Sequence, residues 1–157
     1  GTASSGKIIG IHYANFTATQ TNGASAYTWQ DVTNLTKTIT PASSSSKFWI
    51  YYRLSVGSSG NHVYSQIVVD GTPVHIADSA SPRTRATSIV STKATWDLDT
   101  HSASYLWSPA TASAVTIKIQ WCGENSNVGQ YINRSDRDSG QSDGRATSDM
   151  TVMEIDS

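Results

Sequence analysis

The sequence predicts an all-β fold, an antiparallel sandwich of the jelly-roll type. Ser and Thr make up more than a quarter of the 157 residues, whereas only 15% are charged. Leu, Lys and Glu do not recur at helical spacing. Short apolar or alternating segments instead follow one another roughly every 8–14 residues, separated by turn residues. About ten such segments indicate a two-sheet sandwich with Greek-key connections.

The first five predicted strands end at recognisable turn signals. Pro41 ends the second of them, because proline cannot donate a hydrogen bond to a neighbouring strand. Asp70 and Gly71 end the fourth, since this dipeptide favours a tight turn. The five predicted strands are residues 7–13, 35–40, 47–56, 62–69 and 74–77.

The remaining five predicted strands are also short. Pro109 follows the second of them, and the third shows a regular alternation in which Val115, Ile117, Ile119 and Trp121 share one face. That face is expected to lie in the core. The five predicted strands are residues 86–91, 102–108, 115–121, 128–133 and 148–155.

The length and the net charge of the chain limit its number of domains and its classes of partner. A length of 157 residues suits one domain that buries about two-thirds of its unfolded surface. We expect residues 1–6 to be a flexible linker cut from a longer polypeptide, and residues 7–157 to form a single β-sandwich domain. The net charge of -1 provides no general attraction for nucleic acid. No apolar stretch approaches the ~20 residues that cross a bilayer, so we expect no membrane insertion.

Cys122 is the only cysteine. It therefore excludes an internal disulfide, and its position directly after the predicted strand 115–121 suggests a small buried apolar side chain.

Residues 47–56 are apolar on both faces when read as a strand. Phe48 and alternate residues after it form one apolar face, while Trp49, Tyr51 and Arg53 form the other. The last predicted strand also has two apolar faces, because Met153 lies opposite the face of Met150. A small antiparallel sheet usually buries one face and exposes the other. The second face therefore predicts a partner surface.

We interpret this second face as the interface of a homotrimer. Three copies packed around an axis would cover the exposed aromatic and methionine side chains. The predicted interface residues are Trp49, Tyr51, Arg53 and Met153. The alternative is that loops of the same chain cover this face.

Four segments resemble recurring signatures near the C-terminal ends of bacteriophage tail-fibre-like structural proteins. They are SPRTRATS at residues 81–88, LWSPATASAVTIKIQ at 106–120, YINRS at 131–135 and GRATSDMTVMEI at 144–155. The resemblance implies a receptor-binding tip domain of a virion, similar in architecture to the trimeric jelly rolls of the complement and tumour-necrosis-factor type. It also implies that the partner is a glycan or protein on the host cell surface.

Two loop regions are predicted to bind that ligand. Trp96 lies beside Asp97, Asp99 and His101, and an aromatic ring with polar neighbours suits a sugar. Arg83 and Arg85 could bind anionic groups of a glycan through paired hydrogen bonds. The alternatives are that Trp96 fills the end of the sandwich and that the arginines neutralise Asp78 or a neighbouring subunit.

No catalytic residues, metal site or cofactor are expected. Residues 140–144, GQSDG, match the G-x-S-x-G pattern of a nucleophile elbow, but they lie in a polar loop without a following helix. The four histidines are far apart in the sequence. Asp97 and Asp99 could in principle hold calcium or act in a glycosidase, and a solvated hairpin is the simpler interpretation.

A second acidic cluster lies in the same polar loop. Its three aspartates are interleaved with arginines, so local ion pairs account for it. The aspartates are Asp136, Asp138 and Asp143, and the arginines are Arg134, Arg137 and Arg145.

Three functions therefore remain open. The leading one is a trimeric receptor-binding tip, in which weak contacts of three copies add through avidity. The second is a structural cap or capsid-decoration trimer without a ligand. The third is a polysaccharide-degrading enzyme. The three N-x-[ST] sequons, at Asn15, Asn34 and Asn133, would be unused in a phage protein.

Overall fold

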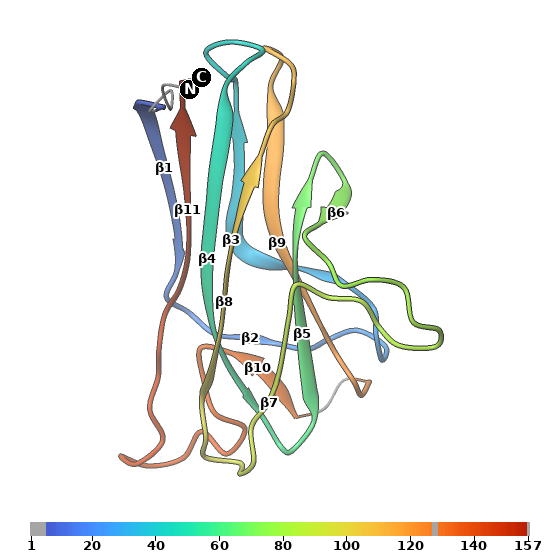
Figure 1. The fold of residues 1–157 in the computed structure, drawn as a ribbon. Helices are drawn as coiled ribbons and strands as arrows, with labels where there is room; N and C mark the ends of the chain where they lie inside the picture. Colours follow the sequence, from blue (N-terminus) through green and yellow to red (C-terminus); the bar gives the residue numbers. More distant parts are fainter. Residues whose placement is uncertain (1–5, 127–128, 157) are drawn as a thin grey trace.

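The computed structural model describes residues 6–126 and 129–156, and the strands of these residues form two antiparallel sheets packed as a sandwich (Figure 1). The strands are β1 (Ile8–Phe16), β2 (Gln20–Thr21), β3 (Gln30–Ile39), β4 (Lys47–Ser58), β5 (His62–Val69), β6 (Thr72–Val74), β7 (Ser88–Ser91), β8 (Asp99–Trp107), β9 (Val115–Gly123), β10 (Gln130–Ile132) and β11 (Ser148–Ile155).

The six-stranded sheet is built around β4. One edge of β4 pairs with β8, and the other edge pairs first with β11 and then with β10. Beyond these, β1 pairs with β11 and β2 pairs with β10. Strands from the two ends of the chain therefore lie side by side, with Ile8 opposite Ile155.

The five-stranded sheet is built around β5. One edge of β5 pairs with β9, which in turn pairs with β3. The other edge pairs with β7 and β6. All these pairings are antiparallel, as the predicted sandwich requires.

The core lies between the two sheets because alternate residues of the long strands face inward. Tyr52 and Ile50 of β4 are fully buried, as are Trp121 and Ile119 of β9. The alternating pattern of residues 115–121 is thus confirmed as a core face. Cys122 is also fully buried, and burial raises the pKa of its thiol to about 12.

The hairpin between β5 and β6 follows from its turn residues. Asp70 and Gly71 have φ values of 46° and 79°, and this pair of positive values is typical of the two-residue turns that match the twist of a hairpin. Pro73 is accommodated because β6 pairs only with β5 and needs no donor on its outer edge.

Several strand boundaries differ from those predicted. Residues 74–77 are predicted as a strand, but β6 spans Thr72–Val74 and ends before His75, whose φ of 53° lies outside the extended region. Strand β3 begins at Gln30, five residues before the predicted start at Leu35. The prediction missed this part because the first two residues are polar and the register shifts between Asp31 and Thr36. Strand β8 starts at Asp99, three residues before the predicted start at residue 102, and β7 starts at Ser88, two residues after the predicted start at residue 86.

One strand was not predicted, and two of the predictions are tested only in part. The two-residue β2 was not predicted, because two polar residues show no periodicity. Val128, the predicted start of a strand, and residues 1–5 of the predicted linker lie outside the described residues. Within the described part of the chain there is no helix long and apolar enough to cross a membrane.

Candidate functional site

The outer face of the six-stranded sheet carries a row of apolar side chains. Met153 lies opposite Ile11 on one side and Trp49 on the other, and Leu106 lies opposite Trp49. The next outward row contains Tyr13 and Tyr51, separated by Thr151. We call Ile11, Tyr13, Trp49, Tyr51, Leu106 and Met153 the outer apolar face.

Most of the outer apolar face is open to solvent. Trp49 is 37% and Tyr51 is 39% exposed, and Ile11 reaches 67%. Within residues 6–126 and 129–156, no loop fully buries these side chains. The structure brings three of the four predicted interface residues, Trp49, Tyr51 and Met153, into one patch.

The fourth predicted interface residue, Arg53, borders this patch. Its Nη2 atom lies 2.8 Å from Oδ2 of Asp149, the residue directly opposite it on β11. The Arg53–Asp149 ion pair therefore forms a polar row next to the row of Tyr13 and Tyr51. An interface on this face would thus combine an apolar centre with a charged margin.

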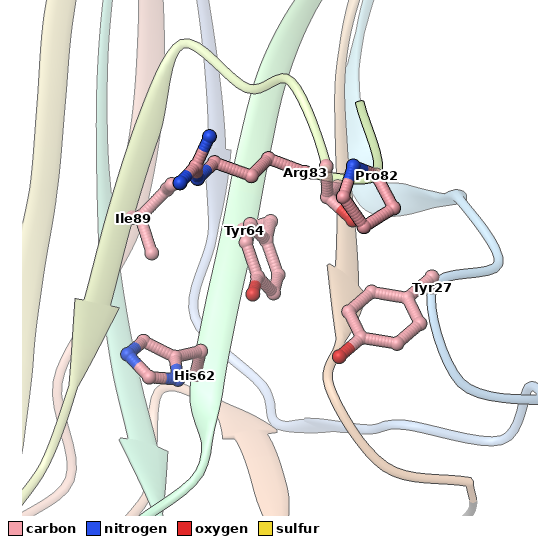
Figure 2. A pocket seen from close by; sticks show the side chains of 7 residues that line it. Tyr27, His62, Tyr64, Pro82, Arg83 and Ile89 are labelled. Carbon is pink, nitrogen blue, oxygen red and sulfur yellow. The ribbon is translucent and has the colours of Figure 1, made fainter. Parts of the chain in front are cut away.

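A pocket of about 840 Å³ lies on the outer side of the five-stranded sheet. Two outward residues of β5, one of β7, one of the loop before β3 and three of the β6–β7 loop line it (Figure 2). These residues are His62, Tyr64, Ile89, Tyr27, Pro82, Arg83 and Thr84. Tyr64 lies at the centre, and its ring centroid is 5.9 Å from that of Tyr27 and 6.2 Å from that of His62.

A carboxylate fixes the orientation of the His62 ring. Oε2 of Glu124 lies 2.7 Å from Nδ1 of His62 and accepts a second hydrogen bond from the backbone nitrogen of the same residue. These bonds lower the pKa of Glu124. Since Nδ1 is engaged, Nε2 is the ring nitrogen left to bond a ligand.

The β6–β7 loop places Arg83 and Arg85 differently. Arg83 lines the pocket, and its side chain runs past Tyr64 towards Ile89 (Figure 2). The Nε atom of Arg85 instead donates to the backbone oxygen of Ala77, which closes the loop on itself. Neither arginine forms an ion pair with Asp78 within the described part of the chain.

The second predicted ligand region, around Trp96, lies on the β7–β8 loop. Trp96 is 56% exposed, so it does not fill the end of the sandwich. The guanidinium of Arg137 lies 5.3 Å from the centroid of its ring. Asp97 accepts a hydrogen bond from the backbone nitrogen of Ala94 and so stabilises the turn that presents the ring. Asp99, at the start of β8, is exposed.

His101 lies away from this loop surface, in the core. It is fully buried, and its Nδ1 atom is 2.6 Å from Oγ of Ser65 on the opposite sheet. Burial lowers the pKa of His101 to about 4, so the ring is neutral at pH 7. The structure thus groups Trp96, Asp97 and Asp99 on one loop and Arg83 in a separate pocket.

The acidic cluster of residues 136–143 forms local ion pairs, as predicted. Arg137 binds Asp143 through two nitrogens and holds the pKa of that carboxyl at about 2. Arg145 binds Asp138 in the same way. Residues 140–144 form a turn rather than a strand leading into a helix. Within residues 6–126 and 129–156, no group of three or more His, Cys, Asp or Glu side chains is placed to hold a metal ion.

The three sequons differ in accessibility. Asn15 and Asn34 are exposed, whereas Asn133 is fully buried. Nδ2 of Asn133 donates to the backbone oxygens of Phe16 and Ala18, and its Oδ1 accepts from Ser148. The folded domain therefore cannot present Asn133 for modification.

The sequence did not indicate most of the pocket residues. The alternation of β5 does place His62 and Tyr64 on its polar face, so an outward tyrosine was a detectable signal. Tyr27 belongs to a segment without periodicity, and a hydrogen bond from its backbone nitrogen to the oxygen of Gly123 holds this segment beside the pocket.

No family model matches this chain, and no curated protein matches it.

Proposed function

We propose that this chain is a non-enzymatic binding domain that assembles as a homotrimer at the tip of a virion fibre and binds a glycan on the host cell surface. The outer apolar face is the observation that carries the proposal. Its six residues span four neighbouring strands, and at least five of them are exposed large apolar side chains. Soluble monomers rarely leave such contiguous patches uncovered.

The pattern of strand pairing supports a jelly roll. Among the eight longest pairing strands, the first pairs with the last, β1 with β11, and the pairs β3–β9, β4–β8 and β5–β7 are nested inside it. This nesting is what a long antiparallel ribbon produces when it folds over into two sheets. The resemblance of residues 81–155 to the ends of phage fibres supports the same architecture and the trimer.

A cyclic trimer would cover the outer apolar face of every copy. Three copies of one patch can close around an axis, and each copy then leaves its loops free for a ligand. The start of β1 and the end of β11 lie together at one end of the sandwich, while the loop that carries Trp96 lies at the other (Figure 1). In a fibre whose shaft joins β1, that loop points towards the host.

The placement of the Ser–His pair favours binding over turnover. Ser65 and His101 are within hydrogen-bond distance, but both are fully buried in the core. A substrate could not reach them without opening the sandwich. Exposed aromatic side chains and an open pocket are features of a binding surface.

The proposal is tested by measuring the mass of the domain and its adsorption in parallel. Light scattering should give three times the chain mass of 16.8 kDa. The same preparation should bind host cells and compete with intact particles. A stable trimer that binds neither cells nor any glycan would indicate the structural cap, and release of sugars from host envelope would indicate the enzyme.

A further inference from the structure

The pocket on the five-stranded sheet combines aromatic rings with a cation. Tyr27 and Ile89 are both about half exposed, and they flank Tyr64 on opposite sides. Tyr and Ile side chains at these positions offer flat apolar surface for the C–H face of a sugar ring. The pocket is of the size that takes a small ligand.

Arg83 differs from the other arginines of the chain. Arg53, Arg134, Arg137 and Arg145 each bind a carboxylate, and Arg85 donates to a backbone oxygen. Among the residues that the structure describes, Arg83 is thus the arginine whose guanidinium has no hydrogen-bond partner. Its five N–H donors lie at the rim of an aromatic pocket, where they could hold a carboxylate in a paired geometry.

Glu124 is the acidic side chain bonded to His62. Burial raises the pKa of Tyr64, and Tyr27 and the charge of Glu124 add to this effect. An acidic group of a ligand is therefore expected beside Arg83 rather than beside His62. Glu124 does not line the pocket, and its Oε2 atom is occupied by two bonds from His62. Because these bonds orient the imidazole, Nε2 of His62 remains to bond a sugar hydroxyl. The pocket therefore presents a cation, an oriented imidazole and apolar rings.

We propose that this pocket binds an acidic sugar, whose carboxylate pairs with Arg83 and whose ring packs on Tyr64. The inference rests on the proposed function, since it names the class of glycan that the domain would take. It assigns the ligand to the outer side of the five-stranded sheet, away from the outer apolar face. Assembly through the six-stranded sheet would leave the pocket open.

The test uses an array of acidic oligosaccharides, each paired with its carboxyl-reduced counterpart. The wild-type trimer should bind at least one acidic glycan about tenfold more tightly than the reduced form, because a charge-assisted hydrogen bond is lost on reduction. Arg83→Gln should lose this preference and bind both forms weakly. Arg83→Lys keeps the positive charge but loses the paired N–H donors of the guanidinium. Its preference for the acidic form should lie between that of the wild type and that of Arg83→Gln.

Two further variants distinguish the loss of the Arg83 contact from the loss of any surface charge and from the loss of the aromatic ring. Lys93→Gln removes an exposed charge from the neighbouring β7–β8 loop and should bind like the wild type. Tyr64→Leu should weaken the acidic and reduced forms equally, since it removes the ring and not the charge. All variants should keep the mass of the wild-type assembly.

The possible failures are distinguishable. If Arg83→Gln retains the preference for the acidic form, or if the wild type binds acidic and reduced glycans equally, the pocket assignment is wrong while the binding function stands. If the wild type binds no glycan of either kind and does not adsorb to cells, the proposed function and the pocket assignment both fail.

Discussion

Ser65 and His101 join the two sheets through the core, with Oγ and Nδ1 2.6 Å apart. The hydroxyl of Tyr52 extends this series of hydrogen bonds and lies 2.8 Å from the same Oγ atom. Nε2 of His101 is buried without a partner among the described residues. Protonation of this ring would therefore place an unpaired charge in an apolar core.

We expect the stability of the domain to fall as the pH is lowered from about 6.5 to 4. The folded pKa of His101 is about 4, below its ordinary value of 6.5, so the unfolded chain takes up the proton first. The full contribution is present above pH 6.5, declines through this window and is lost below pH 4. The loss is about 3 kcal/mol in the free energy of unfolding.

Urea denaturation at several pH values checks this prediction. His101→Phe should flatten the pH dependence between pH 6.5 and 4, because the replacement does not titrate. His75→Phe is the matched control, since the ring of His75 stacks on Tyr105 outside the inner hydrogen-bonded chain. An unchanged slope in His101→Phe would show that another group titrates.

A charge on the outer apolar face should dissociate the assembly. Tyr51→Lys and Met153→Lys each place a cation on adjacent strands of this face, and desolvated like charges from neighbouring copies would repel. Sedimentation velocity should then show the mass of one chain. Thr36→Glu places a charge on the outer side of β3, opposite Lys118, and should leave the assembly intact. Full assemblies in both lysine variants would remove the interface from this sheet.

Trp96→Ala should separate binding from stability. The ring is mostly exposed and its described contact is the cation of Arg137, so the melting temperature should change little. If the ring stacks on a ligand, the variant should lose about 1–3 kcal/mol of binding to host cells. Adsorption at the wild-type level by a folded Trp96→Ala would exclude this loop from the ligand site.

Asn133→Ala should destabilise the domain by about 2–4 kcal/mol, because it breaks three hydrogen bonds, two of them buried, from the residue after β10 to Phe16, Ala18 and Ser148. Asn133 also has a φ of 65°. Asn34→Ala is a close control, since Asn34 has the same φ and is exposed. The difference between the two variants in guanidinium denaturation measures the combined contribution of burial and hydrogen bonding at Asn133. Equal losses would assign the effect to the backbone.

The local pattern of the sequence was enough to predict most of the long strands and the faces of β4, β5, β9 and β11. Residues 47–56 and 115–121 alternate clearly, and both lie in long strands of the sandwich. The second apolar face at Trp49 and Tyr51 was also evident, because alternation depends only on neighbouring residues. Strand ends were less predictable where polar residues begin a strand, as at Gln30.

The ligand surfaces depended on contacts that local patterns do not encode. His101 lies two residues after Asp99 and points to the same side of β8. It lies further into the sandwich, opposite Leu54 of β4, where its ring is fully buried, whereas Asp99 at the start of the strand is exposed. Arg83 and Arg85 are two residues apart, but the closed β6–β7 loop directs only Arg83 into the pocket.

The all-β class, the core faces and the second apolar face of β4 and β11 could all be predicted from the order of residues along single strands. The row of Ile11, Met153, Trp49 and Leu106, and the contact of Tyr27 with Tyr64, could not. Side-chain alternation follows from the geometry of one strand. Strand neighbours and register instead follow from the packing of segments far apart in the chain, such as β1 against β11.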